Sequence, residues 1–235
     1  MNFRYIIIPV FFLLAAAACR KPEIKLPVNA NPGLSDINNI SQVYIFLQIK
    51  NGDTTADMHD GQLITATHWV VHTDRRLPLK TLVGPWQILY KKRHKKSIHS
   101  MPGAKLYLSH VDTLRRQLAL TDFTRMEIWS PFYTSRTYVE KYPASFRNRR
   151  ILHMDLGPVY AMVDTMRFTF PEDKKGMEKY MKKLSENRIP YEVMLNADYR
   201  VSYGRFNDFY SFIALADSSL FRIQPYLFLY NPEDL

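Results

Sequence analysis

The chain has 235 residues, of which 46% are hydrophobic and 14% are aromatic. This composition excludes a disordered tail, and it is sufficient for one large packed domain or two small ones. The formal net charge is +10, and Cys19 is the only cysteine. A single cysteine excludes an intramolecular disulfide framework, so we expect stability to come from a hydrophobic core.

Residues 1–18 have the three parts of a secretory signal. Arg4 is their only charge, an apolar run follows it, and four alanines come directly before Cys19. The apolar run has about fourteen residues, fewer than the roughly twenty of a membrane-spanning helix. The sequence therefore predicts export and cleavage of residues 1–18.

The segment from Leu14 to Cys19 resembles the lipobox of bacterial lipoproteins. The resemblance implies that Cys19 carries a thioether-linked diacylglycerol and, after cleavage, an N-linked acyl chain such as palmitate. Two or three acyl chains hold a protein stably on a membrane. Arg20 and Lys21 follow the cysteine where an inner-membrane retention signal would have aspartate, which favours the outer membrane. Residues 19–40 contain three prolines and no periodicity, and they are predicted to be a flexible tether.

The first predicted half covers residues 41–131. It opens with a β-branched and aromatic run, Val43 to Ile49, which ends at the turn residues Asn51-Gly52-Asp53. In chain order the patterns predict strand 43–49, strand 63–72, helix 85–92, strand 105–109, helix 112–120 and strand 125–129.

The second predicted half covers residues 151–235 and follows a linker at 132–150, which is rich in turn formers and arginine. Its clearest element is a helix that begins after Pro171-Glu172-Asp173, because Met177, Tyr180, Met181 and Leu184 lie on one face. The remaining predictions are strands 151–154 and 159–170, strand 191–195, helix 205–216 and strand 221–230.

The two halves share one predicted order of elements. The sequence thus predicts an α+β fold of two tandem ββαβαβ-like subdomains, each a small sheet with two helices. This arrangement is typical of a diverged tandem duplication.

A segment near the C-terminus, Asn196-Ala197-Asp198-Tyr199-Arg200-Val201-Ser202-Tyr203-Gly204-Arg205-Phe206, resembles the A-D-x-x-V-x-Y-G segment of the ExbD/TolR periplasmic domain. The match extends loosely over residues 151–232. In the first half, Ser109-His110-Val111-Asp112 stands where Ala-Asp would be. From the residues alone, we expect Asp198 to form an Asx-type turn and Gly204 to suit the tight start of a helix.

In the ExbD/TolR family, the periplasmic domain dimerises and contacts partner proteins or peptidoglycan beside an ion-conducting partner. The family's transmembrane helix carries a proton-bearing aspartate, whereas residues 5–18 contain no acidic residue. The resemblance thus implies a non-enzymatic binding or scaffold module, with Asp198, Tyr203, Gly204 and Arg205 as candidate binding residues. The expected partners are a membrane through Cys19, peptidoglycan or an envelope protein complex, and a second copy of the chain.

The alternative is an envelope hydrolase or metal-dependent enzyme that uses the Asp57–His72 region. Asp57, His59, Asp60 and His68 could form a metal site in a loop, although their spacing matches no known ligand pattern. His68 and His72 are predicted to lie on a strand, where about 13 Å would separate them. No G-x-S-x-G, S-x-x-K or phosphate-binding glycine motif is present. We therefore expect no catalytic residue, metal or cofactor. Asp155 and Asp164 are expected to be turn or surface carboxylates rather than the catalytic pair of a glycosidase.

Two further residue sets stand out. Basic clusters occupy residues 91–96, 147–150 and 174–183. Because export excludes nucleic acid as a partner, these clusters indicate binding to anionic lipids, cell-wall carboxylates or acidic proteins. The alternative is that they are solvated helix ends or loops.

The aromatic side chains of residues 206–212 are predicted to form a stripe on one helix. This stripe would cover Tyr226, Phe228 and Tyr230 of the last strand. The alternative is that exposed aromatic side chains bind sugar rings or a partner strand.

Overall fold

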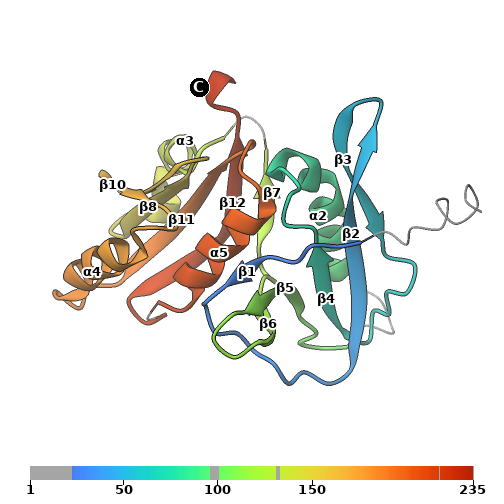
Figure 1. Ribbon diagram of the computed structural model, residues 1–235. Coiled ribbons are helices and arrows are strands. Elements are labelled where there is room, and N and C mark those ends of the chain that lie inside the picture. Colours follow the sequence, from blue (N-terminus) through green and yellow to red (C-terminus); the bar gives the residue numbers. More distant parts are fainter. Residues whose placement is uncertain (1–22, 96–100, 131–132, 217, 235) are drawn as a thin grey trace, which may run out of the picture.

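The structure is a computed structural model that describes residues 23–95, 101–130, 133–216 and 218–234. It contains two mixed sheets of six strands each, which lie side by side with helices packed against them (Figure 1). The predicted α+β fold with two subdomains is confirmed.

The first sheet is ordered β1–β5–β4–β2–β3, with β6 paired to β5. The hairpin of β2 and β3 is antiparallel, and β4 and β5 add in parallel. Helix α2 connects β4 to β5. The bounds are β1 Val28–Asn29, β2 Ile40–Lys50, β3 Asp53–His59, β4 His68–Thr73, α2 Leu79–His94, β5 Leu106–Asp112 and β6 Gln117–Asp122.

The predicted helix at 112–120 is wrong. The chain instead turns after Asp112, whose carboxylate accepts bonds from the backbone N–H groups of Leu114 and Arg115. Arg116 has a φ of 55°, and the returning strand β6 pairs with β5 in antiparallel register. The aspartate thus favours a hairpin turn over the first turn of a helix. The described residues of the first half contain one helix, α2, where two were predicted.

The second sheet is ordered β10–β9–β8–β11–β12–β7. Its bounds are β7 Glu127–Trp129, β8 Arg150–Leu156, β9 Tyr160–Val163, β10 Met166–Thr169, α4 Lys174–Ser185, β11 Tyr191–Asp198, α5 Tyr203–Ala214 and β12 Phe221–Tyr230. Helix α4 confirms the clearest prediction, with Met177 and Met181 buried. The predicted strand 159–170 is divided into β9 and β10 at Asp164, which has a φ of 56°. The strand predicted at 125–129 for the first half is present as β7, but it belongs to the second sheet, where it pairs with β12.

The predicted linker at 132–150 holds helix α3 (Ser135–Lys141) and a 3₁₀ turn, η1 (Pro143–Phe146). Tyr138 and Phe146 pack there against Met194 and Phe228 of the second sheet. This contact corrects the aromatic prediction: Phe228 faces α3, whereas the side chains of α5 cover the opposite face of the sheet with Leu227 and Leu229. Tyr226 and Phe228 do share one face of β12, as the alternation predicts, but this face packs against α3 and not against α5.

The predicted tether differs from the structure over residues 23–40, because this segment packs on the folded core. Strand β1 pairs with β5, and Leu34 forms a bridge with Leu120. Asn29 and Asn31 are buried, and their side-chain amides donate to Asn207 and Asp208 of α5. Side-chain amides supply the bonds that a proline-rich segment cannot make through its own regular backbone pairing.

Both sheets contain the same nucleus, which supports the predicted duplication. β2, β3, β4, α2 and β5 have the connections and the neighbour order of β8, β9, β11, α5 and β12. The second half inserts β10 and α4 between the hairpin and the next parallel strand. When Asp74 is matched to Asp198, the buried residues of α2 (Leu79, Leu82, Trp86, Leu89) match Tyr203, Phe206, Tyr210 and Ile213 of α5, which are all buried.

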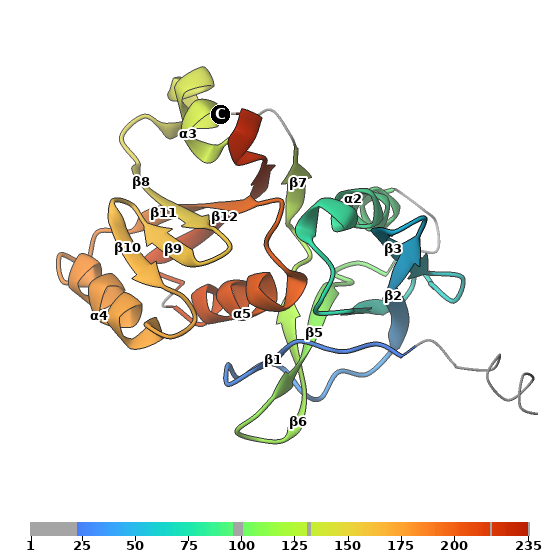
Figure 2. The same ribbon diagram turned by 45° about the horizontal axis from the view of Figure 1, so that its top comes forward.

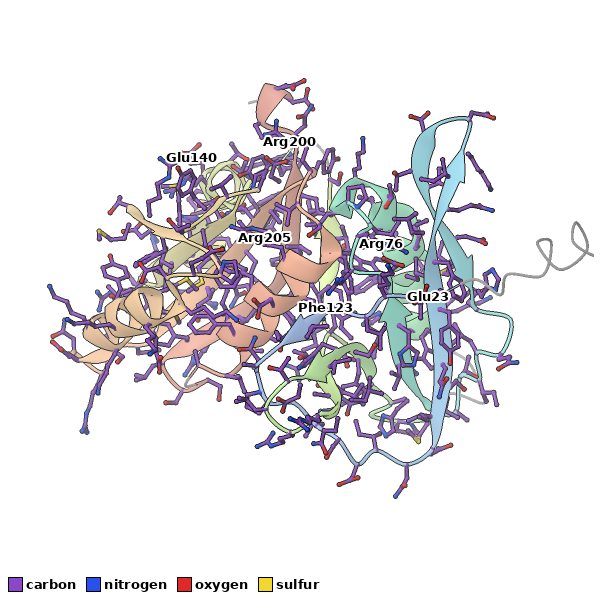
Figure 3. All side chains as sticks on the ribbon, viewed as in Figure 1. Glu23, Arg76, Phe123, Glu140, Arg200 and Arg205 are labelled. Atoms are coloured by element: carbon purple, nitrogen blue, oxygen red, sulfur yellow. The ribbon has the colours of Figure 1, made fainter. Side chains whose placement is uncertain are left out.

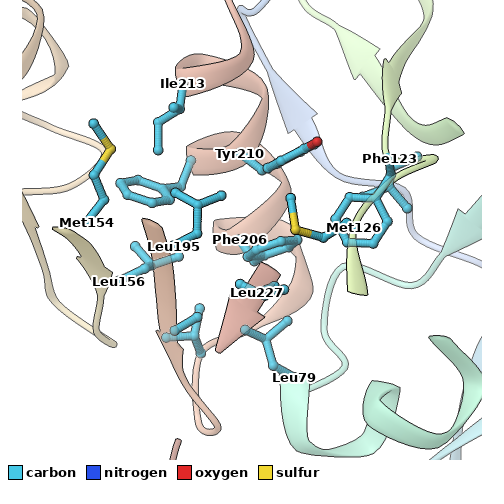
Figure 4. Packing of buried hydrophobic residues seen from close by; sticks show 14 of the residues in the cluster. Leu79, Phe123, Met126, Met154, Leu156, Leu195, Phe206, Tyr210, Ile213 and Leu227 are labelled. Carbon is cyan, nitrogen blue, oxygen red and sulfur yellow. The ribbon is translucent and has the colours of Figure 1, made fainter. Parts of the chain in front are cut away.

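One hydrophobic cluster extends through both halves. Helix α5 lies between them, as Figure 2 shows from above. Phe206 contacts Trp86 of α2 and Phe123, at ring centroid distances of 5.6 and 6.3 Å. Leu195 and Leu227 of the second sheet belong to the same cluster, and Figure 4 shows Leu227 beside Phe206. The two halves therefore share one core.

Candidate functional site

The carboxyl end of β4 leads into a compact turn built around Asp74. Its side chain is fully buried. One carboxylate oxygen accepts from the backbone N–H and the Nε of Arg76, at 3.0 and 2.9 Å, and the other accepts from Nη2 at 2.7 Å. Burial raises the pKa of Asp74, but the bonds from Arg76 and from the backbone N–H of Lys25 outweigh it, and the net pKa lies below the ordinary value. Asp74 is therefore ionised at neutral pH in the folded chain.

The carboxyl end of β11 repeats this turn with Asp198 and Arg200. Asp198 is 2% exposed, and it accepts from the backbone N–H of Arg200 at 2.8 Å and from its guanidinium at 2.7 Å. The counterpart of the Ala-Asp segment in the first half is thus Thr73-Asp74, and the prediction that placed it at Ser109-His110-Val111-Asp112 is wrong. We call Asp74–Arg76 and Asp198–Arg200 the two D-x-R turns.

The segments after the two D-x-R turns pair with each other. The backbone N–H of Leu79 donates to Val201 O at 2.9 Å, and that of Tyr203 donates to Leu77 O at 2.7 Å. Gly204 N–H donates to Arg75 O at 2.9 Å, and a Cβ on Gly204 would lie 3.0 Å from the Cβ of Arg75. The absence of a side chain at Gly204 thus permits the close approach of the two halves. Asp198 and Gly204, two of the candidate binding residues, form part of this joint, as Tyr203 does.

Arg205, the fourth candidate, bridges elements of the second half. Its Nε donates to Gly157 O at 2.9 Å, and its guanidinium also donates to Phe170 O and lies over the Phe170 ring. Burial lowers its pKa. Together with Arg75, Arg76 and Ser202 it lines a groove of about 430 Å³ at the joint; Figure 3 shows Arg76, Arg200 and Arg205 around the meeting point of the halves.

The chain reaches this joint from its N-terminal side. The backbone N–H of Lys25 donates to Asp74 at 3.2 Å, and Arg75 N–H donates to Lys25 O at 2.7 Å. The hydrogen bond between Arg76 and Asp74 is the main cause of the raised pKa of Arg76. The negative charge of Glu23, the first described residue, raises this pKa further. The first described residues therefore lie at the carboxyl end of β4. Cys19 lies outside the described residues.

Two residues of the alternative enzyme site contact each other, and two others have partners outside it. His59 contacts Asp57 at 3.0 Å, Asp60 pairs with Lys92, and the Nδ1 of His68 accepts from Lys105 N–H at 3.1 Å. His68 and His72 lie on strand β4, as predicted. In the described part of the chain, no group of three His, Cys, Asp or Glu side chains is placed to hold a metal ion.

A buried pair that the sequence did not predict lies between strand β4 and its neighbour β5. The Nδ1 of His72 is 2.9 Å from the Oγ of Ser109, and Tyr44 stacks on the imidazole at a centroid distance of 4.9 Å. Burial lowers the pKa of His72 to about 4. Ser109 is fully buried, so a substrate does not reach its hydroxyl. The pair joins β4 to β5, and only the strand register, not the sequence spacing, reveals it.

Asp155 and Asp164, the possible glycosidase pair, lie near the same arginine, because Arg136 lies 3.9 Å from the Asp155 carboxylate and donates to the backbone carbonyl of Asp164 at 3.4 Å. Burial raises the pKa of Asp155. Asp164 occupies the turn between β9 and β10, as expected for a turn carboxylate.

A second groove lies at the opposite edge of the sheets, where β5, β11 and β12 begin. It has a volume of about 900 Å³ and is lined from both halves, by Lys105, Asp122, Arg125 and Met126 from the first and Glu192, Arg222 and Ile223 from the second, among others. Lys105 pairs with Asp122 at 3.0 Å, and Glu192 pairs with Arg149 at 3.6 Å.

Among the helices of the described residues, none has the length and apolar character that crossing a membrane requires.

Comparison of the chain with protein-family models, with curated proteins and with solved structures finds no match. The resemblance of residues 196–206 to the ExbD/TolR family, like that of Cys19 to a lipobox cysteine, stays a prediction.

Proposed function

We propose that this chain is an envelope lipoprotein, held on a membrane through lipid on Cys19, which acts as a non-enzymatic binding or scaffold module. The observation that carries the proposal is the joint of the two D-x-R turns. It uses the most distinctive segment of the sequence to lock two subdomains together by backbone bonds and buried carboxylates. A rigid body of two halves presents broad surfaces to partners, which suits a scaffold.

The site residues support the same proposal. Asp198 and Tyr203 are 2% and 0% exposed, so their role is to hold the joint, whereas Arg205 and Arg76 reach its groove. The partner in this proposal is peptidoglycan or an envelope protein complex, and the outer membrane is the favoured location. A homodimer is an additional arrangement that the ExbD/TolR resemblance implies.

The anchor is tested with a Cys19→Ser variant. Cells that express the full chain are fed an alkyne-labelled fatty acid, and the labelled protein is followed through membrane fractionation. We expect label and membrane association for the wild type and the loss of both for Cys19→Ser. Equal label in the two proteins would contradict the anchor.

The binding role is tested with the detergent-solubilised full chain on isolated cell walls and on envelope extracts. Retention by the wall or by a defined membrane complex supports the module. Turnover of a wall or ester substrate that His59→Ala or His68→Ala abolishes would instead establish the alternative enzyme of the Asp57–His72 region.

A further inference from the structure

The positive charge of the chain is concentrated at one edge of the molecule, and the topology explains why. Each helix that follows a parallel strand starts at the carboxyl end of that strand and runs back. The ends of α2 and α4 therefore lie at the edge where β4, β8, β11 and β12 begin. Helix C-termini favour lysine and arginine through the helix dipole, and both helices carry basic residues in their last turn.

In the first half, this edge holds the end of α2. Lys91, Lys92, Arg93 and Lys95 follow each other there. Arg93 is fixed, since its guanidinium donates to the carbonyls of Thr67 and Lys105 and lies 3.9 Å over the ring of Trp69. Burial lowers its pKa to about 10, which leaves it charged at neutral pH. Lys92 pairs with Asp60, and the other two lysines face solvent.

In the second half, the same edge holds the segments that precede β8, β11 and β12. Arg149 pairs with Glu192, and Arg150 lies over the ring of Tyr191 at 4.2 Å. The described residues give no acidic partner to a further set of exposed cations, which are Arg147, Lys182, Lys183, Arg188 and Arg222. Arg149, Arg150 and Arg222 also line a smaller pocket of about 370 Å³.

The groove of about 900 Å³ joins the two sets, because Lys105 and Arg125 line it from the first half and Arg222 lines it from the second. We call this surface the basic edge. It consists of the end of α2, Lys105, Arg125, the arginines before β8, the end of α4, Arg188 and Arg222. Charges from six separate chain segments thus form one elongated surface. Two of its acids, Asp122 and Glu192, are paired with Lys105 and Arg149, and Glu186 at the end of α4 is an exposed acid among these cations.

The described part of the chain begins at the opposite edge, where Lys25 bonds to Asp74 at the carboxyl end of β4. Strand β4 separates that point from the basic edge by about 20 Å, and the 16 residues of α2 span about 24 Å in the same direction. Four residue steps from Cys19 to Glu23 reach at most about 14 Å. A lipid on Cys19 therefore holds the carboxyl ends of the strands against the membrane and leaves the basic edge on the far side.

We infer that the basic edge binds peptidoglycan through its carboxylates, on the side of the protein that faces away from the anchoring membrane. The inference rests on the proposed function and deepens it by naming the surface and the chemistry of the partner. An elongated row of cations from several segments fits a polymer whose charges are spaced along a chain. The membrane itself is disfavoured by the distance from the anchor.

The test uses the detergent-solubilised full chain with insoluble peptidoglycan sacculi, and measures the bound fraction by sedimentation at 50 to 300 mM salt. The basic-edge variant combines Lys182→Gln, Lys183→Gln, Arg188→Gln and Arg222→Gln. The matched control removes four exposed cations from the opposite edge that do not line the groove at the joint, Lys25→Gln, Lys50→Gln, Lys80→Gln and Lys175→Gln. Circular dichroism and thermal unfolding establish that both variants fold.

We expect the affinity for sacculi to fall at least about tenfold in the basic-edge variant and to change less than about twofold in the control, with binding of the wild type weakening as salt rises. Equal retention of both variants would overturn the inference while leaving the proposed module intact. No retention of the wild type by sacculi would also overturn it, and if no envelope extract retains the protein either, the proposed function fails as well. Anionic phospholipid vesicles form the last arm: stronger binding to them than to sacculi, with the same dependence on the basic edge, would assign this surface to a membrane.

Discussion

At the scale of single residues, the same position in the two halves is filled by different buried polar groups. His72 in β4 corresponds to Asn196 in β11. Asn196 accepts from the backbone N–H of Ser135 and donates to its hydroxyl, both at 2.7 Å. His72 has Ser109 as a partner, while its Nε2 is buried without a bond among the described residues. The amide is satisfied from several directions, whereas the imidazole is held neutral by burial.

His72 should therefore make stability depend on pH. Its pKa is about 4 in the folded chain and 6.5 ordinarily, so between these two values the imidazole is protonated in the unfolded chain and neutral in the folded chain. The contribution of His72 to the free energy of unfolding is therefore complete above pH 6.5. It decreases as the pH falls toward 4, by at most about 3 kcal/mol. We expect His72→Gln to reduce the loss of unfolding free energy between pH 7 and pH 4.5, as measured by urea titration. His59→Gln, at an exposed histidine, is the control; an unchanged slope for His72→Gln would contradict the expectation.

At the scale of elements, the two D-x-R turns perform one task at equivalent places. Each ends a central parallel strand and positions the start of a helix, and the two following segments bond across the joint. Both aspartates are buried, whereas both arginines are about half exposed. The carboxylates thus organise the turns, and the arginines neutralise them at the surface.

Asp74→Asn and Asp198→Asn should destabilise the protein by similar amounts, about 1–3 kcal/mol each, because each removes charge-assisted bonds to an arginine. Glu178→Gln on the exposed face of α4 should leave the free energy of unfolding within about 0.5 kcal/mol of the wild type. Chemical denaturation measures all three. A loss at Asp198 alone would show that only the segment with the ExbD/TolR-like residues acts as a joint.

At the scale of the whole molecule, the two halves depend on each other. Phe206 of α5 packs against Trp86 of α2, and the cluster that contains both reaches the second sheet through Leu195 and Leu227. The N-terminal segment adds buried amide bonds between β1 and α5. Neither half has a complete core when the other is removed.

We therefore expect a single cooperative unfolding transition. A variant that keeps only Trp86 reports by fluorescence on the first half, and a variant that keeps only Trp129 reports on the second sheet. The midpoints of the two unfolding transitions should coincide. Phe206→Ala should lower the unfolding free energy by about 3–5 kcal/mol in both reporters, because it leaves a cavity in the shared core. Separate midpoints, or a shift in one reporter alone, would contradict a shared core.

Much of the fold follows from local pattern. The alternating run at 43–49 lies in β2, and the period of Met177 and Met181 with an acidic cap at Asp173 lies in α4, because strand and helix periodicity need only neighbours in the chain. Asp112 misled the prediction, since one aspartate serves either a helix start or a turn, and the pairing of β6 with β5 decides between them.

The sequence by itself determined the class of fold, the resemblance at 196–206 and the prediction of an anchor at Cys19. Only the tertiary structure decided that Asp74 is the partner of Asp198, that residues 23–40 pack on the core, and that basic clusters far apart in the sequence meet at one edge. The physical reason is the same in each case. These features depend on strand register and on the direction in which helices return, and both are set by contacts between residues distant in the chain.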